Sequence, residues 1–386
     1  MKKALVLIFV LSCGVFKNSA SGAETHGRVT VNNVLYSESS EAPDYNISTV
    51  RLRLTTKKDA LSKTAFHFDS RFRVRTGERA LHSDIPKLRI TSLFLQAEEV
   101  TERIGIDAGR FAVSGARGVW VDGMHVQYRL NGAKVSGAFV GTEPDPYKDG
   151  LNTDFTTFGG YFSREKKQAG IGIASVNSFF KGKQDRTFLD IHGFLNPTSK
   201  TNLSHTSTVD YDQSRKRARL TNFSLNLTTR VFSSLRIRLS FNRYEAVKRQ
   251  KSMNYDPFPG HEARYSINLF YRGIRNYFIY SRADFRHRSF DKRDSLLYSL
   301  GVRRREFFFS GLEASLRFSY HDHFSSKLLS GGVELRREFF EKLDISGSVT
   351  AREESSTFLN TEQNVLVYFA GADMMVSRNF FFSTNI

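Results

Sequence analysis

The amino-acid sequence predicts an all-β fold, a transmembrane antiparallel up-and-down β-barrel of about 18–22 strands that follows a signal peptide. Three observations predict it: long segments in which apolar and polar residues alternate, the lack of any apolar run long enough for a membrane helix, and links of alternating length. We expect residues 1–23 to be the signal peptide and residues 24–386 to form one barrel without a second domain.

The alternation has a period of two residues, which is that of a β-strand. In residues 64–75, every second position from Phe66 to Val74 is apolar or a serine, and the intervening positions include Arg71, Arg73 and Arg75. The pattern recurs at 50–55, 235–242, 312–321 and 343–352. A soluble β-sandwich also alternates, but its strands usually have only about five or six residues. The longer segments here, with Gly, Ala and Ser mixed into the apolar face, favour a lipid-facing wall.

Composition agrees with this pattern. The 386 residues include 35 Phe, yet the mean hydropathy is -0.38, so apolar and polar residues are finely interleaved. The longest apolar run covers residues 4–11, far short of the roughly 18–20 apolar residues that a membrane helix needs. Barrel strands need only about 9–11 residues each. A transmembrane helix after the N-terminus is therefore excluded, whereas a membrane barrel is not.

The N-terminus has the parts of a secretory signal. Lys2 and Lys3 precede the apolar residues 4–10, and Ser21-Gly22-Ala23 forms a small-residue cleavage site before Glu24. An alternative is that residues 10–13 are a lipoprotein box, which would leave Cys13 lipidated. Because Cys13 is the only cysteine, disulfides, a cysteine-based zinc site, c-type haem attachment and thiol catalysis are excluded for the mature chain.

The links between the segments alternate between short and long. Short links are expected near 57–62, 98–102, 131–132 and 164–167, and longer ones between them, although those near 181–184 and 322–326 are short. Short periplasmic turns and longer extracellular loops produce this rhythm in membrane barrels. About 20 strands are expected, and residues 380–386 begin an odd-numbered one, whereas bacterial barrels have even counts.

Together these features resemble bacterial outer-membrane porins over residues 24–386. The resemblance is one of architecture, and it is supported by Asp107-Ala108-Gly109-Arg110, by Val121-Asp122-Gly123 and by the following Tyr128-Arg129-Leu130. The chain departs from the family at its end, because such barrels usually finish with Phe or Trp and this one ends in Ile386. The resemblance implies a location in the bacterial outer membrane, in contact with lipopolysaccharide.

Arginines alternate with the apolar residues and should point into the lumen, since Arg facing lipid at mid-bilayer costs about 2–4 kcal/mol. The predicted lumenal residues are Arg51, Arg53, Arg71, Arg73, Arg75, Arg129, Arg236, Arg238, Arg282, Arg286, Arg303, Arg317 and Arg352. Rings of arginine and lysine build anion-selective pores. The alternative is a static ladder in which these arginines pair with Asp69, Asp107, Glu313, Glu334 and Asp344, or contact lipopolysaccharide near the rim.

Three other segments carry residues that could form a site. The longest loop, 248–262, carries Tyr255, Asp256 and Phe258 and could fold inward as a constriction, or lie outside the barrel. The acidic residues of 143–154 match no calcium-binding pattern and indicate a solvated loop. His321 and His323 lack a visible third ligand, so no metal site is predicted, and no other cofactor is expected.

The function predicted from the sequence is a porin-like channel for passive diffusion of small hydrophilic, anionic solutes, with no enzymatic activity. One alternative is a scaffold barrel that sheathes a multihaem cytochrome or an exported polysaccharide. Another is an outer-membrane barrel enzyme that acts on lipids. The net charge of +18 also suggests nucleic acid, but the basic residues alternate along strands and the chain carries an export signal. A homo-oligomer or a periplasmic partner is compatible with the sequence.

Overall fold

Twenty-two β-strands form one sheet in a computed structural model of the protein. The described residues are 4–13, 25–38, 45–56, 64–77, 88–98, 100–130, 133–144, 152–212, 216–247, 249, 260–339, 343–356, 361–377 and 380–385. Side chains are described in these ranges from Arg28 to Val367, apart from 31–47 and 75–77.

The first eleven strands are β1 (Ala4–Cys13), β2 (Thr25–Glu38), β3 (Tyr45–Thr56), β4 (Thr64–Gly77), β5 (Leu88–Ala97), β6 (Ile104–Ala112), β7 (Trp120–Arg129), β8 (Lys134–Thr142), β9 (Phe155–Glu165), β10 (Ala169–Phe180) and β11 (Lys183–Thr198). The remaining strands are β12 (Thr201–Asp212), β13 (Arg217–Arg230), β14 (Leu235–Glu245), β15 (His261–Tyr271), β16 (Tyr277–Arg288), β17 (Arg293–Arg305), β18 (Leu312–Asp322), β19 (Ser326–Phe339), β20 (Leu343–Ser356), β21 (Thr361–Ser377) and β22 (Phe380–Asn385).

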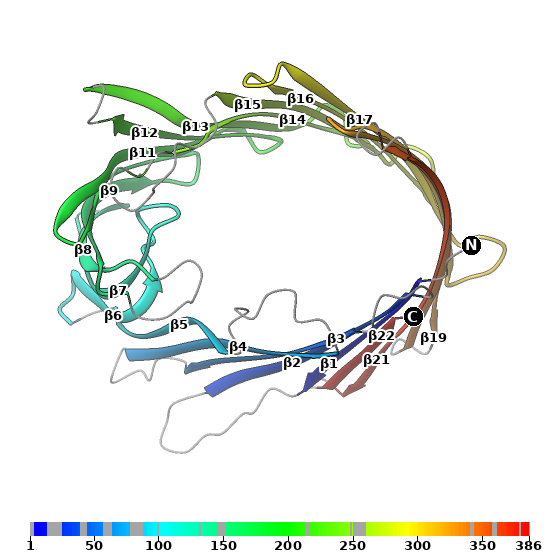
Figure 1. The fold of residues 1–386 in the computed structure, drawn as a ribbon, viewed down its shortest axis with the longest axis horizontal. Coiled ribbons are helices and arrows are strands. Elements are labelled where there is room, and N and C mark those ends of the chain that lie inside the picture. Colours follow the sequence, from blue (N-terminus) through cyan, green and yellow to red (C-terminus); the bar gives the residue numbers. More distant parts are fainter. Residues whose placement is uncertain are drawn as a thin grey trace.

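Each strand pairs antiparallel with its neighbours in the sequence, and β22 pairs antiparallel with β1, so the sheet closes on itself. Viewed along its axis, the sheet is an oval ring in which β14–β16 lie opposite β1–β4 (Figure 1). The predicted fold class, an up-and-down antiparallel β-barrel with 18–22 strands, is confirmed. Within the described residues, no helix is long and apolar enough to cross a membrane.

The N-terminal segment that we interpret as a signal peptide includes β1, which lies between β2 and β22. The cleavage site at Ser21, Gly22 and Ala23 lies outside the described residues. Removal of residues 1–23 by a signal peptidase therefore stays a prediction.

The strands extend further into the links than the alternation indicates. For example, β16 continues to Arg288 and β20 to Ser356, so the links that follow them have only four residues each. The long links are concentrated in the first two thirds of the chain, at 78–87, 143–154 and 246–260. The alternation of short and long links is therefore clear from β4 to β10 and, apart from the long β14–β15 link, weak over the rest of the barrel.

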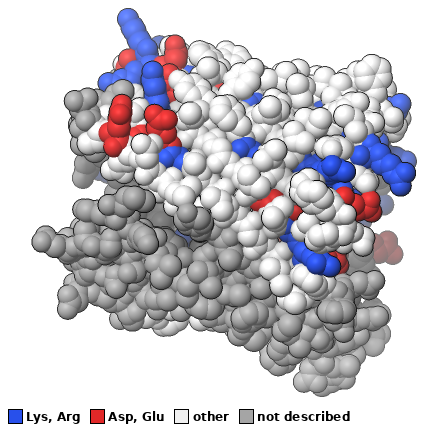
Figure 2. Space-filling view, turned by 90° about the vertical axis from the view of Figure 1, so that its right-hand side faces the viewer, with Lys and Arg blue, Asp and Glu red and all other residues white. Residues whose placement is uncertain are grey.

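The outer wall carries a wide band of uncharged side chains between two groups of charged ones (Figure 2). Large apolar residues in this wall are strongly exposed, among them Leu300, Leu316 and Val333. Large exposed apolar surfaces are unusual on soluble proteins, whereas an apolar band bounded by polar rims is what a bilayer requires.

Candidate functional site

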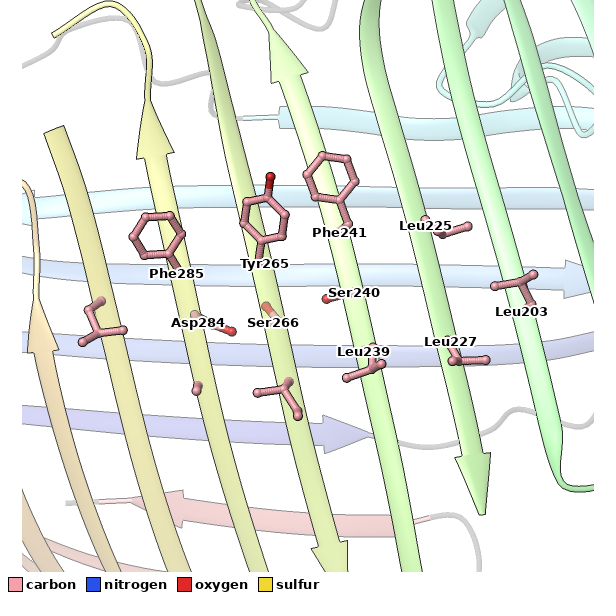
Figure 3. Close-up of a pocket in the computed structure, with 13 residues that line it drawn as sticks. Leu203, Leu225, Leu227, Leu239, Ser240, Phe241, Tyr265, Ser266, Asp284 and Phe285 are labelled. Carbon is pink, nitrogen blue, oxygen red and sulfur yellow. The ribbon is translucent and has the colours of Figure 1, made fainter. Parts of the chain in front are cut away.

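Alternation separates two faces of the wall. On β14, β15 and β16 the apolar residues Phe241, Tyr265 and Phe285 lie side by side in register. Polar residues alternate with them, including Ser266 and Asp284, as Figure 3 shows. In a closed barrel the exposed apolar face is the outer one, so the alternating polar residues line the lumen.

An aromatic row crosses the outer face. The rings of His205, Phe223, Phe241, Tyr265 and Phe285 follow one another across five strands with centroids 4.8–6.3 Å apart. Below this row the wall is hollowed into a shallow apolar groove of about 530 Å³ (Figure 3). The row has the composition of an aromatic girdle, which membrane barrels place at the lipid–water boundary.

The arginines predicted from the sequence lie on the polar face of their strands. They are Arg51 and Arg53 on β3, Arg71 and Arg73 on β4, Arg129 on β7, Arg236 and Arg238 on β14, Arg282 and Arg286 on β16, Arg303 on β17, Arg317 on β18 and Arg352 on β20. The side chain of Arg75 lies outside the described residues. Whether these residues form an anion path stays a prediction.

Half of these arginines are held by carboxylates. Asp69 accepts hydrogen bonds from both Arg51, at 2.8 Å from Nε, and Arg53, at 3.1 Å. Asp284 likewise accepts from Arg282. The other pairs are Arg129–Glu98, Arg303–Glu313 and Arg317–Glu334. The alternative prediction, in which the lumenal arginines pair with carboxylates, therefore holds for six of the twelve described arginines. Asp107 and Asp344 are not part of it, because Asp107 pairs with His125 and Asp344 with Arg336.

The other half forms no ion pair within the described residues. These arginines are Arg71, Arg73, Arg236, Arg238, Arg286 and Arg352. Arg71 lies directly opposite Arg51 on one neighbouring strand and Arg89 on the other, so three guanidinium groups share one row. Asp69 offsets the charge of Arg51 in this row, and like charges directly opposite each other are otherwise unfavourable. The lumenal wall of β3–β5 is thus strongly positive.

A polar recess of about 300 Å³ lies in the wall of β16–β20. Its lumenal lining includes the guanidinium-bearing side chains of Arg317 and Arg352 and the hydroxyl-bearing side chains of Ser330, Ser348 and Thr350. Glu334 also lines the recess and pairs with Arg317, whereas Arg352 has no carboxylate partner there. The recess therefore offers one unpaired guanidinium among hydroxyl groups.

The link between β6 and β7, residues 113–119, packs onto the lumenal face instead of lying outside. Its apolar residues Val113, Ala116 and Val119 are buried. They belong to a cluster with Phe111, Val121, Phe139, Tyr161, Ala174, Val176 and Phe188. Further along, Arg117 Nη1 donates a 2.9 Å hydrogen bond to Thr206 Oγ1 on β12. We call residues 113–119 the inner link; it narrows the lumen along β6–β12.

A buried polar chain lies under the inner link. The imidazole of His125 is 1 % exposed; its Nδ1 lies 2.8 Å from Asp107 Oδ2, and its Nε2 lies 2.9 Å from the Tyr161 hydroxyl. Ser114 of the inner link is within hydrogen-bonding reach of the same hydroxyl. Both ring nitrogens of His125 have partners, whereas Asp107 Oδ1 is buried without a hydrogen-bond partner among the described residues. The chain therefore ties the inner link to three strands of the wall.

Two glycines make room for the Tyr161 ring. A Cβ at Gly115 would lie 2.0 Å from a ring carbon of Tyr161, and one at Gly137 would lie 2.6 Å from the ring's other edge. No side chain fits at either position without displacing the ring. The ring is therefore held between the inner link on one side and β8 on the other.

The long loop between β14 and β15 is tied back to a distant part of the wall. Arg249 donates hydrogen bonds to both carboxylate oxygens of Glu143, which follows β8, and its guanidinium lies 3.8 Å from Asp185 on β11. Burial lowers the pKa of Arg249, but the hydrogen bond to Glu143 and the attraction of Glu143 and Asp185 outweigh burial and raise that pKa. Arg249 is thus anchored to residues near β8 and on β11, several strands away from the β14–β15 hairpin to which it belongs.

Tyr255, Asp256 and Phe258, predicted as constriction residues in this loop, lie outside the described residues. The inner link was missed, because the sequence analysis treated it as one more long link. A weak signal is present in the sequence: Val113, Ala116 and Val119 recur at every third position of the link, and these are the residues that the structure buries. Among the described residues, no group of three metal-ligating side chains was found.

Comparisons with known proteins give weak likenesses only. No family model and no curated protein matches the sequence. Among solved structures, the translocation pore of the P pilus usher PapC is 10% identical, with 99% of this chain and 98% of that chain covered and a TM-score of 0.41. The Pseudomonas aeruginosa proteins OccK8 (OprE) and OpdQ are 9% and 10% identical, cover 100% of this chain and 98% of theirs, and have TM-scores of 0.39 and 0.40. The fold, a closed antiparallel barrel, is established by the pairing of the strands themselves.

Proposed function

We propose that this protein is a bacterial outer-membrane channel through which small hydrophilic solutes diffuse passively, with a preference for anions. The outer wall supports the membrane location, because its exposed apolar band and aromatic row suit lipid and would be unfavourable in water.

The observation that carries the anion preference is the set of lumenal arginines that have no carboxylate partner among the described residues. Arg71, Arg286 and Arg352 come from three separate parts of the ring, on β4, β16 and β20. Unpaired guanidinium groups around a confined aqueous path raise the local concentration of anions. The recess beside Arg352 adds hydroxyl donors, which suits carboxylate or phosphate groups.

The chain's own segments narrow the lumen, which favours a channel over the alternative of a sheath around a large partner. The inner link occupies space along β6–β12, and Arg249 draws the β14–β15 loop toward Glu143 and Asp185. A passage narrowed in this way selects solutes by size and charge and needs no covalent chemistry. We therefore also propose that the protein is not an enzyme.

The arrangement closest to a catalytic one is Asp107–His125–Tyr161, with Ser114 beyond the tyrosine. Here the partner of His125 Nε2 is a phenol instead of a serine, and the imidazole is buried. Activity toward phospholipids or esters that disappears in a Ser114→Ala variant would support the lipid enzyme over the channel.

The test is the reversal potential of the purified barrel in a planar bilayer under a gradient of potassium chloride. The wild type should give the sign of an anion-preferring channel. A variant with Arg71→Gln, Arg286→Gln and Arg352→Gln should move the potential toward zero or to the cation side. A cation-preferring wild type, or a variant with unchanged selectivity, would contradict the proposal.

A further inference from the structure

The rim of the barrel at the β17–β18 and β19–β20 hairpins carries arginines that face outward. On β17 the exposed residues Leu296, Tyr298 and Leu300 define the outer face, and Arg304 continues this face at the strand's end. On β19 the exposed Val333 and Leu335 define it, and Arg337 follows. Both arginines thus stand at the edge of the apolar wall.

Aromatic rings flank each of these arginines. The Arg304 guanidinium lies 5.3 Å from the centroid of Tyr277 and 5.7 Å from that of Phe307. That of Arg337 lies 4.8 Å from Phe309 and 4.6 Å from Phe339. The rings orient the guanidinium groups but do not neutralise their charge.

Neither arginine forms an ion pair within the described part of the chain. By contrast, the residues next to them in sequence point to the lumen and are paired: Arg305 with Glu313, and Arg336 with Asp344. Arg304 lies opposite Ala314, a small residue on the strand between the two arginines. The two outward charges therefore lie on one open patch of the rim, beside apolar wall.

The β17–β18 turn adds an exposed aromatic residue at a conformational cost. Phe308 has a φ of 65°, in the left-handed region that costs a non-glycine residue about 1–2 kcal/mol. Its side chain is 84 % exposed, the most exposed large apolar residue described. An exposed aromatic side chain at the rim is well placed to enter the boundary between headgroups and acyl chains.

We propose that Arg304 and Arg337, with Phe308, form a binding site for the headgroup of an anionic phospholipid, whose phosphate accepts hydrogen bonds from the two guanidinium groups. Arginine binds phosphate through its planar fork of donors, and aromatic rings favour the membrane boundary. The β17–β18 and β19–β20 links lie at the rim opposite the long links 78–87, 143–154 and 246–260. The long loops of an outer-membrane barrel are extracellular, so the ligand would belong to the phospholipid leaflet on the periplasmic side. The inference rests on the proposed membrane location but not on transport.

The full-length protein in detergent would be titrated with phosphatidylglycerol or with phosphatidylcholine, and bound lipids counted by native mass spectrometry. One basic residue near an anionic surface is worth about 5-fold in affinity, so Arg304→Gln with Arg337→Gln should weaken phosphatidylglycerol binding about 25-fold. Phosphatidylcholine should bind weakly to the wild type, and its binding should not change. Arg304→Lys with Arg337→Lys should retain much of the affinity.

The matched control is the lumenal pair, Arg305→Gln with Arg336→Gln, which removes the same charge from the adjacent positions. This control should bind phosphatidylglycerol as the wild type does. Equal losses of phosphatidylglycerol affinity in both double variants, or equal binding of the two lipids to the wild type, would overturn the proposed site. So would displacement of the lipid by millimolar inorganic phosphate, which would indicate a site for free phosphate. Conductance of the same variants reports separately on the channel, because Arg304 and Arg337 do not face the lumen.

Discussion

His125 Nε2 and the Tyr161 hydroxyl lie 2.9 Å apart beneath the inner link, with the imidazole almost fully buried. Asp107 holds the other ring nitrogen, which orients the imidazole toward Tyr161. The Tyr161 hydroxyl is also within hydrogen-bonding reach of Ser114 in the inner link. Tyr161 therefore connects His125 in the wall of the barrel to the inner link.

Replacing Tyr161 with Phe should loosen the inner link. The change keeps the ring but leaves His125 Nε2 buried without its partner, which costs about 1–3 kcal/mol. Trypsin should then cleave after Arg117 several-fold faster than in the wild type. Tyr298→Phe, on the outer wall, is the control and should leave the cleavage rate unchanged; equal rates in all three proteins would show that the hydroxyl does not hold the link.

Gly115→Ala should displace the inner link by a steric route. The added methyl would overlap the Tyr161 ring, since the Cβ position lies 2.0 Å from a ring carbon. A Cys13→Ala, Ala116→Cys background reports the displacement, because Ala116 is 0 % exposed. The introduced thiol should react slowly with a polar maleimide, and faster after Gly115→Ala. Fast labelling before the glycine is changed would mean that the link is not packed as described.

Glu143→Gln should release the β14–β15 loop from its anchor. The variant loses a charge-assisted hydrogen-bonded pair with Arg249, worth about 1.5–3 kcal/mol, while Asp185 remains nearby. Tryptic cleavage after Arg249 should accelerate, and single-channel conductance should rise if the loop narrows the pore. Glu98→Gln, which removes the longer contact to Arg129, is the control. Unchanged cleavage in Glu143→Gln would remove the basis for an anchored loop.

Alternation, together with the length of the alternating segments and the lack of an apolar run long enough for a membrane helix, was sufficient to predict the barrel. The strands of such a barrel have one face toward an apolar environment and one toward a polar environment. Residues 64–75 illustrate this, since the predicted faces of Phe66 and Arg71 are the observed ones. The partners of the lumenal arginines were harder to predict. Pairing depends on register, and a bulge such as the one between Asp69 and Ser70 shifts which residues lie opposite each other.

The inner link could not be located from the sequence for a related reason. Its packing depends on Tyr161, Val176 and Phe188, which lie on later strands. It also depends on the hydrogen bond from Arg117 to Thr206, which is 89 residues further along the chain. A strand signal is local, whereas the position of a loop depends on contacts distant in sequence. The same holds for Arg249 and Glu143, which are 106 residues apart.

The N-terminus of the mature protein can be determined from its intact mass. We expect cleavage after Ala23, which would remove β1 and leave β2 and β22 as neighbours. Both pair antiparallel with β1, so they run in the same direction. A mass that includes residues 4–13 would contradict the signal peptide, and an acylated Cys13 would support the lipoprotein alternative.

Glu334→Gln and Arg352→Gln should change ion selectivity in opposite directions. Glu334 and Arg352 line the same recess, so each variant alters one charge at nearly the same place in the lumen. Removing the Glu334 carboxylate frees Arg317 and should strengthen the anion preference, whereas Arg352→Gln should weaken it.

The free energy of unfolding should change by no more than about 1 kcal/mol in Glu334→Gln, because the Arg317 side chain is 56% exposed and exposed ion pairs contribute little. Reversal potentials measured at low salt, where screening is weakest, give the sharpest comparison. Shifts of the same sign would mean that these charges do not face the conducting path.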